Sequence, residues 1–184
     1  GDGEFPEPVA DLLRIGVLCN NADLEEGTGD PLEAALLQAG RDRGWSRDTM
    51  LEETPEEREV DFSRETMMMA TIHKTGDGYL FAVKGAPEAV MESCPDLDDA
   101  DAWRERSENL AGEGLRVLGF ARKTESSADA DPYENLEFLG FVGMEDPVRQ
   151  EVKEPLAVCR AAGIRVIMVT GDQPATARAI ARDL

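Results

Sequence analysis

The fold of this chain is decided by the stretch Tyr79-Leu80-Phe81-Ala82-Val83-Lys84-Gly85-Ala86-Pro87-Glu88. Its first five residues form a short apolar run that is typical of a buried strand. Residues 89–92 predict a helix, and Pro87 suits its first turn because proline already has the φ angle that a helix needs. The junction places the Lys84 ammonium at a sheet edge beside backbone N–H groups, where an anion or a polar ring can bind.

The composition of the 184 residues excludes several classes of protein. A net charge of −20 argues against a surface that binds nucleic acid or inserts into an anionic membrane. The three cysteines form no CxxC pair, which favours a reduced protein, and the single histidine excludes a zinc-type metal site. No apolar run approaches the ~20 residues of a membrane span, and no signal peptide is visible. Because the first residue is not methionine, we expect a soluble, excised piece or a processed form.

The pattern over residues 1–145 predicts an α+β domain with a largely antiparallel sheet. Asp30 at an N-cap, Pro31 at the first position and Glu33 at the third position predict the start of a helix. The other expected elements are a helix or strand at 12–19, an exposed connection at 47–59, a strand at 67–73 that pairs with 79–83 in a hairpin, a helix at 99–110, a strand at 115–121, an acidic loop at 124–135 and a strand at 136–144.

A different pattern begins at residue 146 and predicts a second, partial domain over 146–184. A helix through Val152 and Cys159 ends at Gly163, and the continuous apolar run Ile164–Val169 has the character of a strand that is buried on both faces. A loop and a last helix follow it. This order predicts a truncated Rossmann-like α/β fragment of the haloacid-dehalogenase type.

Seven segments, in order along the chain, resemble P-type cation-transporting ATPases of the calcium-pump or sodium-pump kind. The segments are Leu18-Cys19-Asn20-Asn21-Ala22, Gly29-Asp30-Pro31-Leu32-Glu33, Phe62-Ser63-Arg64-Glu65, Lys84-Gly85-Ala86-Pro87-Glu88, Gly114-Leu115-Arg116-Val117-Leu118, Asp146-Pro147-Val148-Arg149 and the run from Gly163 to Asp172. Each match is weak by itself, whereas the ordered set is specific.

The resemblance implies an ATP site in the first domain. Its residues are Glu33, Phe62, Arg64, Lys84, Gly85, Arg116 and Leu118. In the family, the adenine stacks on the position of Phe62 and packs on that of Leu118, the lysine at Lys84 lines the pocket, and the glutamate at Glu33 contacts the adenine amino group. The arginines at Arg64 and Arg116 lie at the phosphates. Aromatic stacking and charge-assisted donors are the chemistry that a nucleotide needs.

Each of these residues also has a purely structural interpretation. Phe62 could be a core residue, and Glu33 could satisfy helix N–H groups in a capping box. Lys84 could be a solvated lysine that protects a sheet edge. The family often has a basic residue where Met67 stands, so one expected nucleotide contact is missing.

The second domain, by the same resemblance, contributes support for a phosphoryl group. These residues are Asp146, Arg149, Thr170, Gly171 and Asp172. The family's phosphorylated aspartate lies in an Asp-Lys-Thr-Gly-Thr motif that this chain lacks. The segment His73-Lys74-Thr75-Gly76-Asp77 is only superficially similar, because it lacks the leading aspartate and falls in the predicted hairpin. We therefore expect ATP or ADP binding without autophosphorylation or hydrolysis.

The leading hypothesis is an ATP-binding domain from the cytoplasmic side of a cation pump, which acts with Mg²⁺ and with the actuator, phosphorylation and membrane domains of the longer protein. One alternative is a self-sufficient haloacid-dehalogenase-like phosphatase, which requires an Asp-x-Asp pair at a strand end; Asp129 and Asp131 have this spacing but fall in the expected acidic loop. Another is a non-catalytic interaction module with a degenerate pocket. Because the strand 164–169 lacks its usual neighbours here, we expect 146–184 to be poorly ordered, to rearrange or to pair with another molecule through exposed strand edges.

Overall fold

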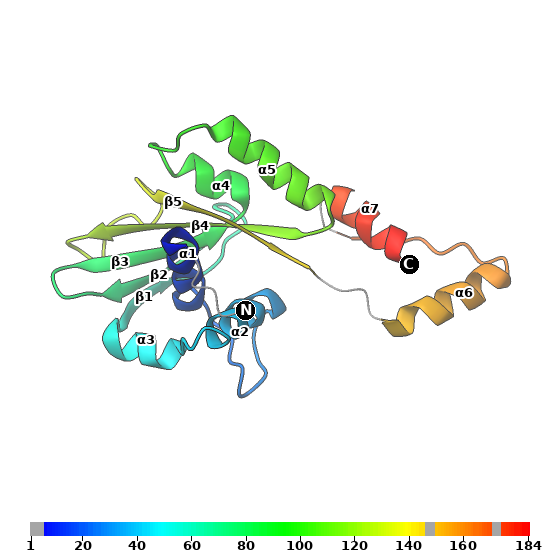
Figure 1. Cartoon of the computed structure of the whole chain (residues 1–184), viewed down its shortest axis with the longest axis horizontal. Coiled ribbons are helices and arrows are strands. Elements are labelled where there is room, and N and C mark those ends of the chain that lie inside the picture. Colours follow the sequence, from blue (N-terminus) through cyan, green and yellow to red (C-terminus); the bar gives the residue numbers. More distant parts are fainter. Residues whose placement is uncertain (1–5, 146–149, 171–173) are drawn as a thin grey trace. The chain divides into compact units, whose positions relative to one another are not determined.

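The computed structural model describes residues 6–145, 150–170 and 174–184 (Figure 1). The chain divides into two compact units. The first contains residues 1–100 and 118–142, and the second contains 101–117 and 143–184.

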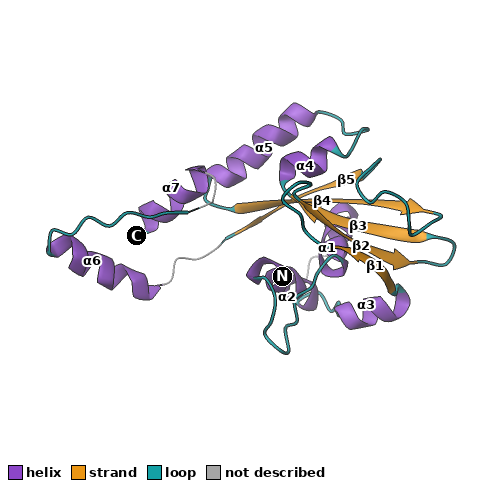
Figure 2. Cartoon of the chain, turned by 180° about the vertical axis from the view of Figure 1, so that it is seen from behind, coloured by secondary structure: helices purple, strands orange, loops and turns teal. Residues whose placement is uncertain are grey.

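A five-stranded sheet with the strand order β1-β2-β3-β4-β5 is the centre of the fold (Figure 2). Its strands are β1 (Glu56–Val60), β2 (Met68–Lys74), β3 (Tyr79–Gly85), β4 (Arg116–Glu125) and β5 (Glu137–Met144). The pairs β1–β2, β2–β3 and β3–β4 are antiparallel. This confirms the predicted α+β class with an antiparallel sheet, including the hairpin between β2 and β3.

The helices begin largely where the sequence signals predict. They are α1 (Glu7–Leu18), α2 (Pro31–Arg41), α3 (Arg47–Glu53), α4 (Pro87–Glu92), α5 (Ala100–Gly112), the short 3-10 helix η1 (Gln150–Val152), α6 (Lys153–Ala161) and α7 (Pro174–Asp183). The Asp30 carboxylate accepts a hydrogen bond of 2.8 Å from the Leu32 N–H and caps α2. The ambiguous segment 12–19 is helical and forms most of α1.

The segment 47–59 is exposed or half-buried throughout, as expected, but the expectation of an irregular connection is wrong, because the segment forms α3 and most of β1. Its charged residues concealed the strand. Strand β1 lies at the edge of the sheet, where charged side chains discourage pairing with another molecule and remain in solvent. The two elements are also joined by an ion pair of 3.0 Å between Arg47 Nη2 and Glu56 Oε2.

The central strands bury side chains on both faces of the sheet. One face forms an apolar cluster that includes Met68, Phe81 and Val90 of α4. The opposite face lies against α1 and α2, as the close approach of Gly16 to Leu36 and Phe120 shows. Because side chains alternate along a strand, Lys84 points to this second face, together with Met69 of β2. The lysine of the junction is therefore buried under α1 and α2 and does not lie at an open edge.

His73 on β2 is fully buried and has a defined hydrogen-bonding role. Its Nδ1 lies 3.2 Å from the Thr54 carbonyl and its Nε2 lies 2.8 Å from Thr71 Oγ1. The neutral ring with the proton on Nδ1 satisfies both partners, since it donates to the carbonyl and accepts from the hydroxyl. Burial lowers the pKa of His73 from its ordinary 6.5 to about 4.

We expect this histidine to make stability depend on pH. The folded pKa lies below the unfolded value, so the unfolded chain binds the proton more readily. The contribution is complete above pH 6.5 and is lost as the pH falls toward 4. The expected loss at pH 4 is about 3 kcal/mol in the free energy of unfolding, measured by denaturant titration. The variant His73→Gln keeps all the carboxylates, so it shows how much of the pH dependence they cause. If the free energy of unfolding falls equally with pH in both proteins, the assignment to His73 is wrong.

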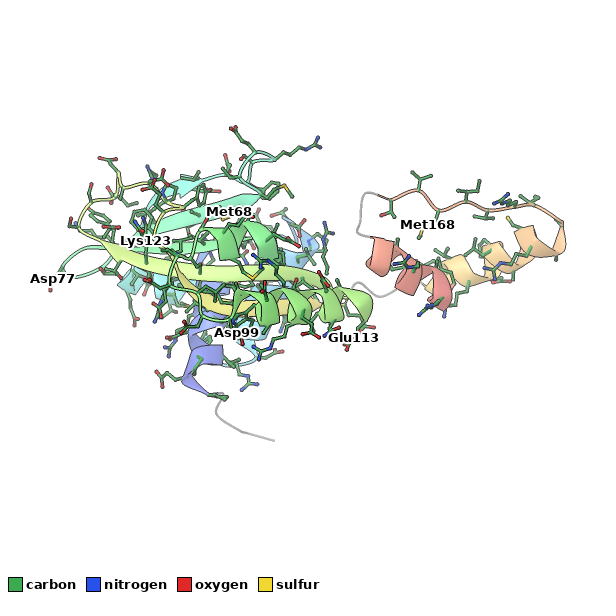
Figure 3. The ribbon with its side chains drawn as sticks, turned by 90° about the horizontal axis from the view of Figure 1, so that it is seen from above. Met68, Asp77, Asp99, Glu113, Lys123 and Met168 are labelled. Atoms are coloured by element: carbon green, nitrogen blue, oxygen red, sulfur yellow. The ribbon has the colours of Figure 1, made fainter. Side chains whose placement is uncertain are left out.

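The second unit differs from its expected architecture. Residues 164–169 form no strand, and Val169 is 91% exposed. Met168 lies in this extended segment (Figure 3). A parallel strand needs hydrogen-bonding neighbours and cover on both faces, and residues 150–170 and 174–184 contain no strand that could supply them. The predicted Rossmann-like fragment is therefore not present in the described part of the chain, although its two helices form as α6 and α7.

No helix within the described ranges has the length and apolar character to span a membrane.

Candidate functional site

Lys84, near the end of β3, is held by two oxygen atoms. Its Nζ lies 2.5 Å from Glu33 Oε1 and donates a hydrogen bond of 2.6 Å to the Cys19 carbonyl. The residue is only 6% exposed. The alternative of a solvated edge lysine is therefore wrong. Glu33 and Lys84 do lie together, as the resemblance implies, and they form an ion pair with each other.

Glu33 lies in the first turn of α2, where the sequence also predicted a capping role. Its Oε1 pairs with Lys84, and its Oε2 accepts a hydrogen bond of 3.3 Å from the Asn21 N–H. The side chain thus reaches across to the loop after α1 and to β3. A carboxylate in this position can accept further donors only on its solvent side, since both oxygens already have partners.

The loop after α1 supplies partners that sequence reasoning did not single out. Asn20 is fully buried and donates from Nδ2 to the Gly16 carbonyl at 3.2 Å and to the Glu33 carbonyl at 2.9 Å. Cys19 is also buried, and desolvation raises the pKa of its thiol to about 11, so it is no nucleophile at neutral pH. In the sequence, the only sign of this role was that Asn20 falls in the family-like segment 18–22, because sequence alone does not distinguish a buried asparagine from an exposed one.

Phe62 is 55% exposed, so the alternative of a core residue is wrong. It precedes a turn that is closed by a hydrogen bond of 2.8 Å from the Met67 N–H to the Ser63 carbonyl. Within this turn, the hydroxyl oxygens of Ser63 and Thr66 lie 2.8 Å apart. Met67 ends this turn in the left-handed region, with φ 55°, and its side chain is 43% exposed. The structure thus presents an exposed aromatic ring on an ordered turn.

The turn that carries Phe62 is joined to the junction at Gly85. The Ala86 N–H donates a hydrogen bond of 2.9 Å to the Met67 carbonyl. Gly85 pairs with Met68, and a Cβ at Gly85 would lie 2.4 Å from the Met67 carbonyl oxygen. Only glycine permits this approach. The β2–β3 register therefore brings Phe62 and Lys84, which are 22 positions apart in sequence, to the same end of the sheet.

The three remaining predicted nucleotide residues have different placements. Arg64 is exposed on the Phe62 turn, and Leu118 is half-buried on β4. Arg116 is exposed at the start of β4 and belongs to the second unit. The position of Arg116 with respect to the first unit therefore stays a prediction.

Most of the residues that are expected to support a phosphoryl group fall outside the described residues, namely Asp146, Arg149, Gly171 and Asp172. Thr170 is described and is exposed. Within the described ranges, no group of histidine, cysteine or carboxylate side chains could hold a metal ion.

Two motifs that resemble phosphorylation sites have structural roles. The segment 73–77 covers the end of β2 and the following turn, and it follows no parallel strand. Asp131 lies in the loop between β4 and β5, where its carboxylate accepts a hydrogen bond of 2.8 Å from the Tyr133 N–H. Neither place is the end of a parallel strand, where a phosphatase nucleophile of this type lies.

A small cleft of about 120 Å³ lies elsewhere in the first unit. It is lined by residues of the loop after α1, by Leu37 and Arg41 of α2, and by the segment 45–48. Neither Lys84 nor Phe62 lines it. We assign the candidate site to Lys84 because the aromatic ring, the ion pair and the glycine junction occur there.

The site therefore combines a buried Lys84–Glu33 ion pair with an exposed Phe62 at the same end of an antiparallel sheet in an α+β domain. The chain belongs to the P-type ATPase family and matches its cytoplasmic domain N over residues 8–151. The matched residues make up most of the chain, so this cytoplasmic domain is the part of the family that the chain represents.

Three relatives illustrate the similarity. The chain is 39% identical to calcium-transporting ATPase 1 of Bacillus cereus, with 94% of this chain and 21% of the relative covered. It is 36% identical to the cation-transporting ATPase pma1 of Synechocystis, with 97% and 22% covered. It is 34% identical to the sodium/potassium-transporting ATPase subunit alpha-2 of Pongo abelii, with 93% and 20% covered. The chain therefore spans about a fifth of the length of these relatives.

Proposed function

We propose that this chain binds ATP and ADP at the end of the sheet where Phe62 and Lys84 lie. The observation that carries the proposal is that Phe62 is 55% exposed and directly precedes a turn that the Met67 carbonyl fixes to the Gly85–Ala86 junction. An exposed aromatic ring in a chain with so few aromatic residues is available for stacking on a base.

The polar groups around Phe62 divide the proposed site into a base end and a phosphate end. Lys84 and Glu33 neutralise one another under α1 and α2, so they suit the polar edge of a neutral base, with Glu33 accepting from the adenine amino group. Arg64 is exposed and can give charge-assisted hydrogen bonds to phosphate. Arg116 joins it at the phosphates, and Leu118 packs on the base.

In the longer pump, we propose that residues 1–145 form the nucleotide-binding domain and that 146–184 form part of the phosphorylation domain. The bound ATP, with Mg²⁺, presents its γ-phosphate to an aspartate that lies outside this chain. Asp146, Arg149, Thr170, Gly171 and Asp172 support that phosphoryl group. The chain itself does not hydrolyse ATP, and it acts on the cytoplasmic side of a membrane that the longer protein crosses.

The exposed segment 164–169 fits this proposal. Its apolar side chains include Ile167, which is 71% exposed. A run of this kind is covered in a folded protein, so we propose that other segments of the longer pump cover it. In the isolated chain, association between copies through this segment is the expected alternative.

The variant Phe62→Ala tests the site. We expect ATP affinity to fall about tenfold in calorimetric titrations, because stacking on an aromatic side chain contributes ~1–3 kcal/mol. The thermal unfolding temperature should change little, since the ring is more than half exposed. Val9→Ala on α1 is a control that removes a different exposed apolar side chain, 42% exposed. Equal ATP affinities in the native protein and in Phe62→Ala would contradict the assignment.

Simple assays distinguish nucleotide binding from the two alternative functions, a phosphatase and an interaction module. A phosphatase would hydrolyse a generic phosphate ester and would lose this activity in Asp129→Asn; we expect no activity in either protein. An interaction module with a degenerate pocket would show no nucleotide binding at millimolar ATP.

A further inference from the structure

Three consecutive residues after α1 control the surroundings of Lys84. Cys19 supplies the carbonyl that accepts from Lys84 Nζ at 2.6 Å, and Asn21 supplies the N–H that lies 3.3 Å from Glu33 Oε2. Asn20 stands between them and is 0% exposed. Both groups that hold the ammonium therefore depend on the path of this short loop.

The Asn20 side chain fixes that path from both sides. Its Nδ2 donates to the Gly16 carbonyl in the last turns of α1 and to the Glu33 carbonyl in the first turn of α2. Its Oδ1 accepts a hydrogen bond of 2.9 Å from the Ala22 N–H. Both donors of the amide are used, and its acceptor is satisfied. An aliphatic side chain would leave three backbone groups, two of them on buried residues, without this partner.

We propose that Asn20 is a positioning residue of the nucleotide site, which places the Cys19 carbonyl and the Glu33 carboxylate so that Lys84 stays at the base end. This inference rests on the proposed function for its effect on binding. Its effect on Lys84 itself can be measured without nucleotide. Asn20 acts through Lys84 and Glu33 and touches no ligand, because it is fully buried.

Chemical labelling of lysine tests whether Asn20 keeps the Lys84 ammonium in contact with the Cys19 carbonyl and the Glu33 carboxylate. The folded protein is treated with a succinimidyl acetate reagent, and acetylation at each lysine is followed by mass spectrometry. In Asn20→Ala we expect Lys84 to be acetylated at least about fivefold faster than in the native protein, because loss of the loop anchors releases its two partners. Asn109→Ala is the matched control, since it also replaces an asparagine by alanine but removes an exposed side chain on α5.

Lys123 provides an internal reference within each protein (Figure 3). It is 8% exposed, and its Nζ donates to the Asp131 and Glu134 carbonyls at 2.5 and 2.9 Å. Asn20 is not among its partners, so its labelling rate should stay the same in all variants. A parallel increase at Lys123 and Lys84 would mean general loosening of the fold and would overturn the proposal.

The second test measures the affinity of the native protein and of Asn20→Ala for ATP and for adenosine. We expect the Kd values of ATP and adenosine to rise together in Asn20→Ala, by at least about fivefold, because the Lys84–Glu33 pair lies at the base end. If the native protein binds ATP and Asn20→Ala has native labelling and native affinity, the proposal is wrong. If the native protein binds no ATP, the proposed function is wrong. The acetylation rate of Lys84 still decides whether Asn20 positions Lys84.

Asn20→Asp is the second variant if Asn20→Ala does not fold. It keeps the size of the side chain and the acceptor for the Ala22 N–H, but it turns a carboxylate oxygen toward the Gly16 and Glu33 carbonyls. We expect the same selective increase at Lys84. Native labelling of Lys84 in this variant would overturn the proposal.

Discussion

Replacement of Gly85 by alanine should unfold the chain or lower its free energy of unfolding by about 4 kcal/mol or more. An alanine Cβ would lie 2.4 Å from the Met67 carbonyl oxygen, 2.7 Å from Met68 Cγ and 2.8 Å from Met68 Cα. Two of these atoms are backbone, so no side-chain rotation relieves the contact, and the β2–β3 ladder must shift. Such overpacking exceeds the usual range of ~1–3 kcal/mol because the main chain itself is displaced.

The measurement is denaturant unfolding, compared with Gly76→Ala. Gly76 lies in the β2–β3 turn, and a Cβ there would meet nothing within 4 Å. This control should differ from the native protein by less than about 0.5 kcal/mol. If Gly85→Ala is as stable as Gly76→Ala, the close approach at the junction does not constrain the fold. A folded Gly85→Ala protein should also bind ATP more weakly, because the Phe62 turn is fixed through Met67.

Replacement of Lys84 by methionine should destabilise the chain by about 4 kcal/mol. The Glu33 carboxylate, with 14% of its side chain exposed, would keep only the Asn21 N–H as a partner. Removal of one member of a buried ion pair costs ~3–5 kcal/mol because the other charge stays buried without compensation. The double variant Lys84→Met/Glu33→Leu should recover much of this loss, since it removes both charges and keeps the volume.

A surface pair provides the control for that cycle. Arg104 Nη1 and Asp101 Oδ1 are also 2.5 Å apart, but their side chains are 54% and 95% exposed. Arg104→Met should therefore leave the unfolding free energy unchanged within error. A double variant no more stable than Lys84→Met would show that burial of the Glu33 charge is not the cause of the loss.

The first unit was predictable where one local signal determined one local structure. Asp30 and Pro31 predicted the start of α2, and the turn at 74–78 predicted the β2–β3 hairpin. Strand β1 was missed because its residues Glu56–Val60 carry the charges of an edge strand, and in sequence these resemble an exposed loop. In the second unit, the apolar run 164–169 predicted a buried strand, but a strand needs neighbours that local sequence does not supply.

The sequence by itself determined the family and the kinds of residue at the candidate site. Short motifs such as Lys84–Glu88 consist of consecutive residues, so they and their order along the chain can be recognised without the structure. Only the tertiary structure decided what those residues contact. Lys84 was open to any anion in sequence, and its burial under α1 and α2 pairs it with Glu33 and the Cys19 carbonyl. Phe62 could have been a core residue, and the turn that ends at Met67 leaves it exposed. Partners so distant in sequence meet only through strand register and helix packing, and these are properties of the whole first unit.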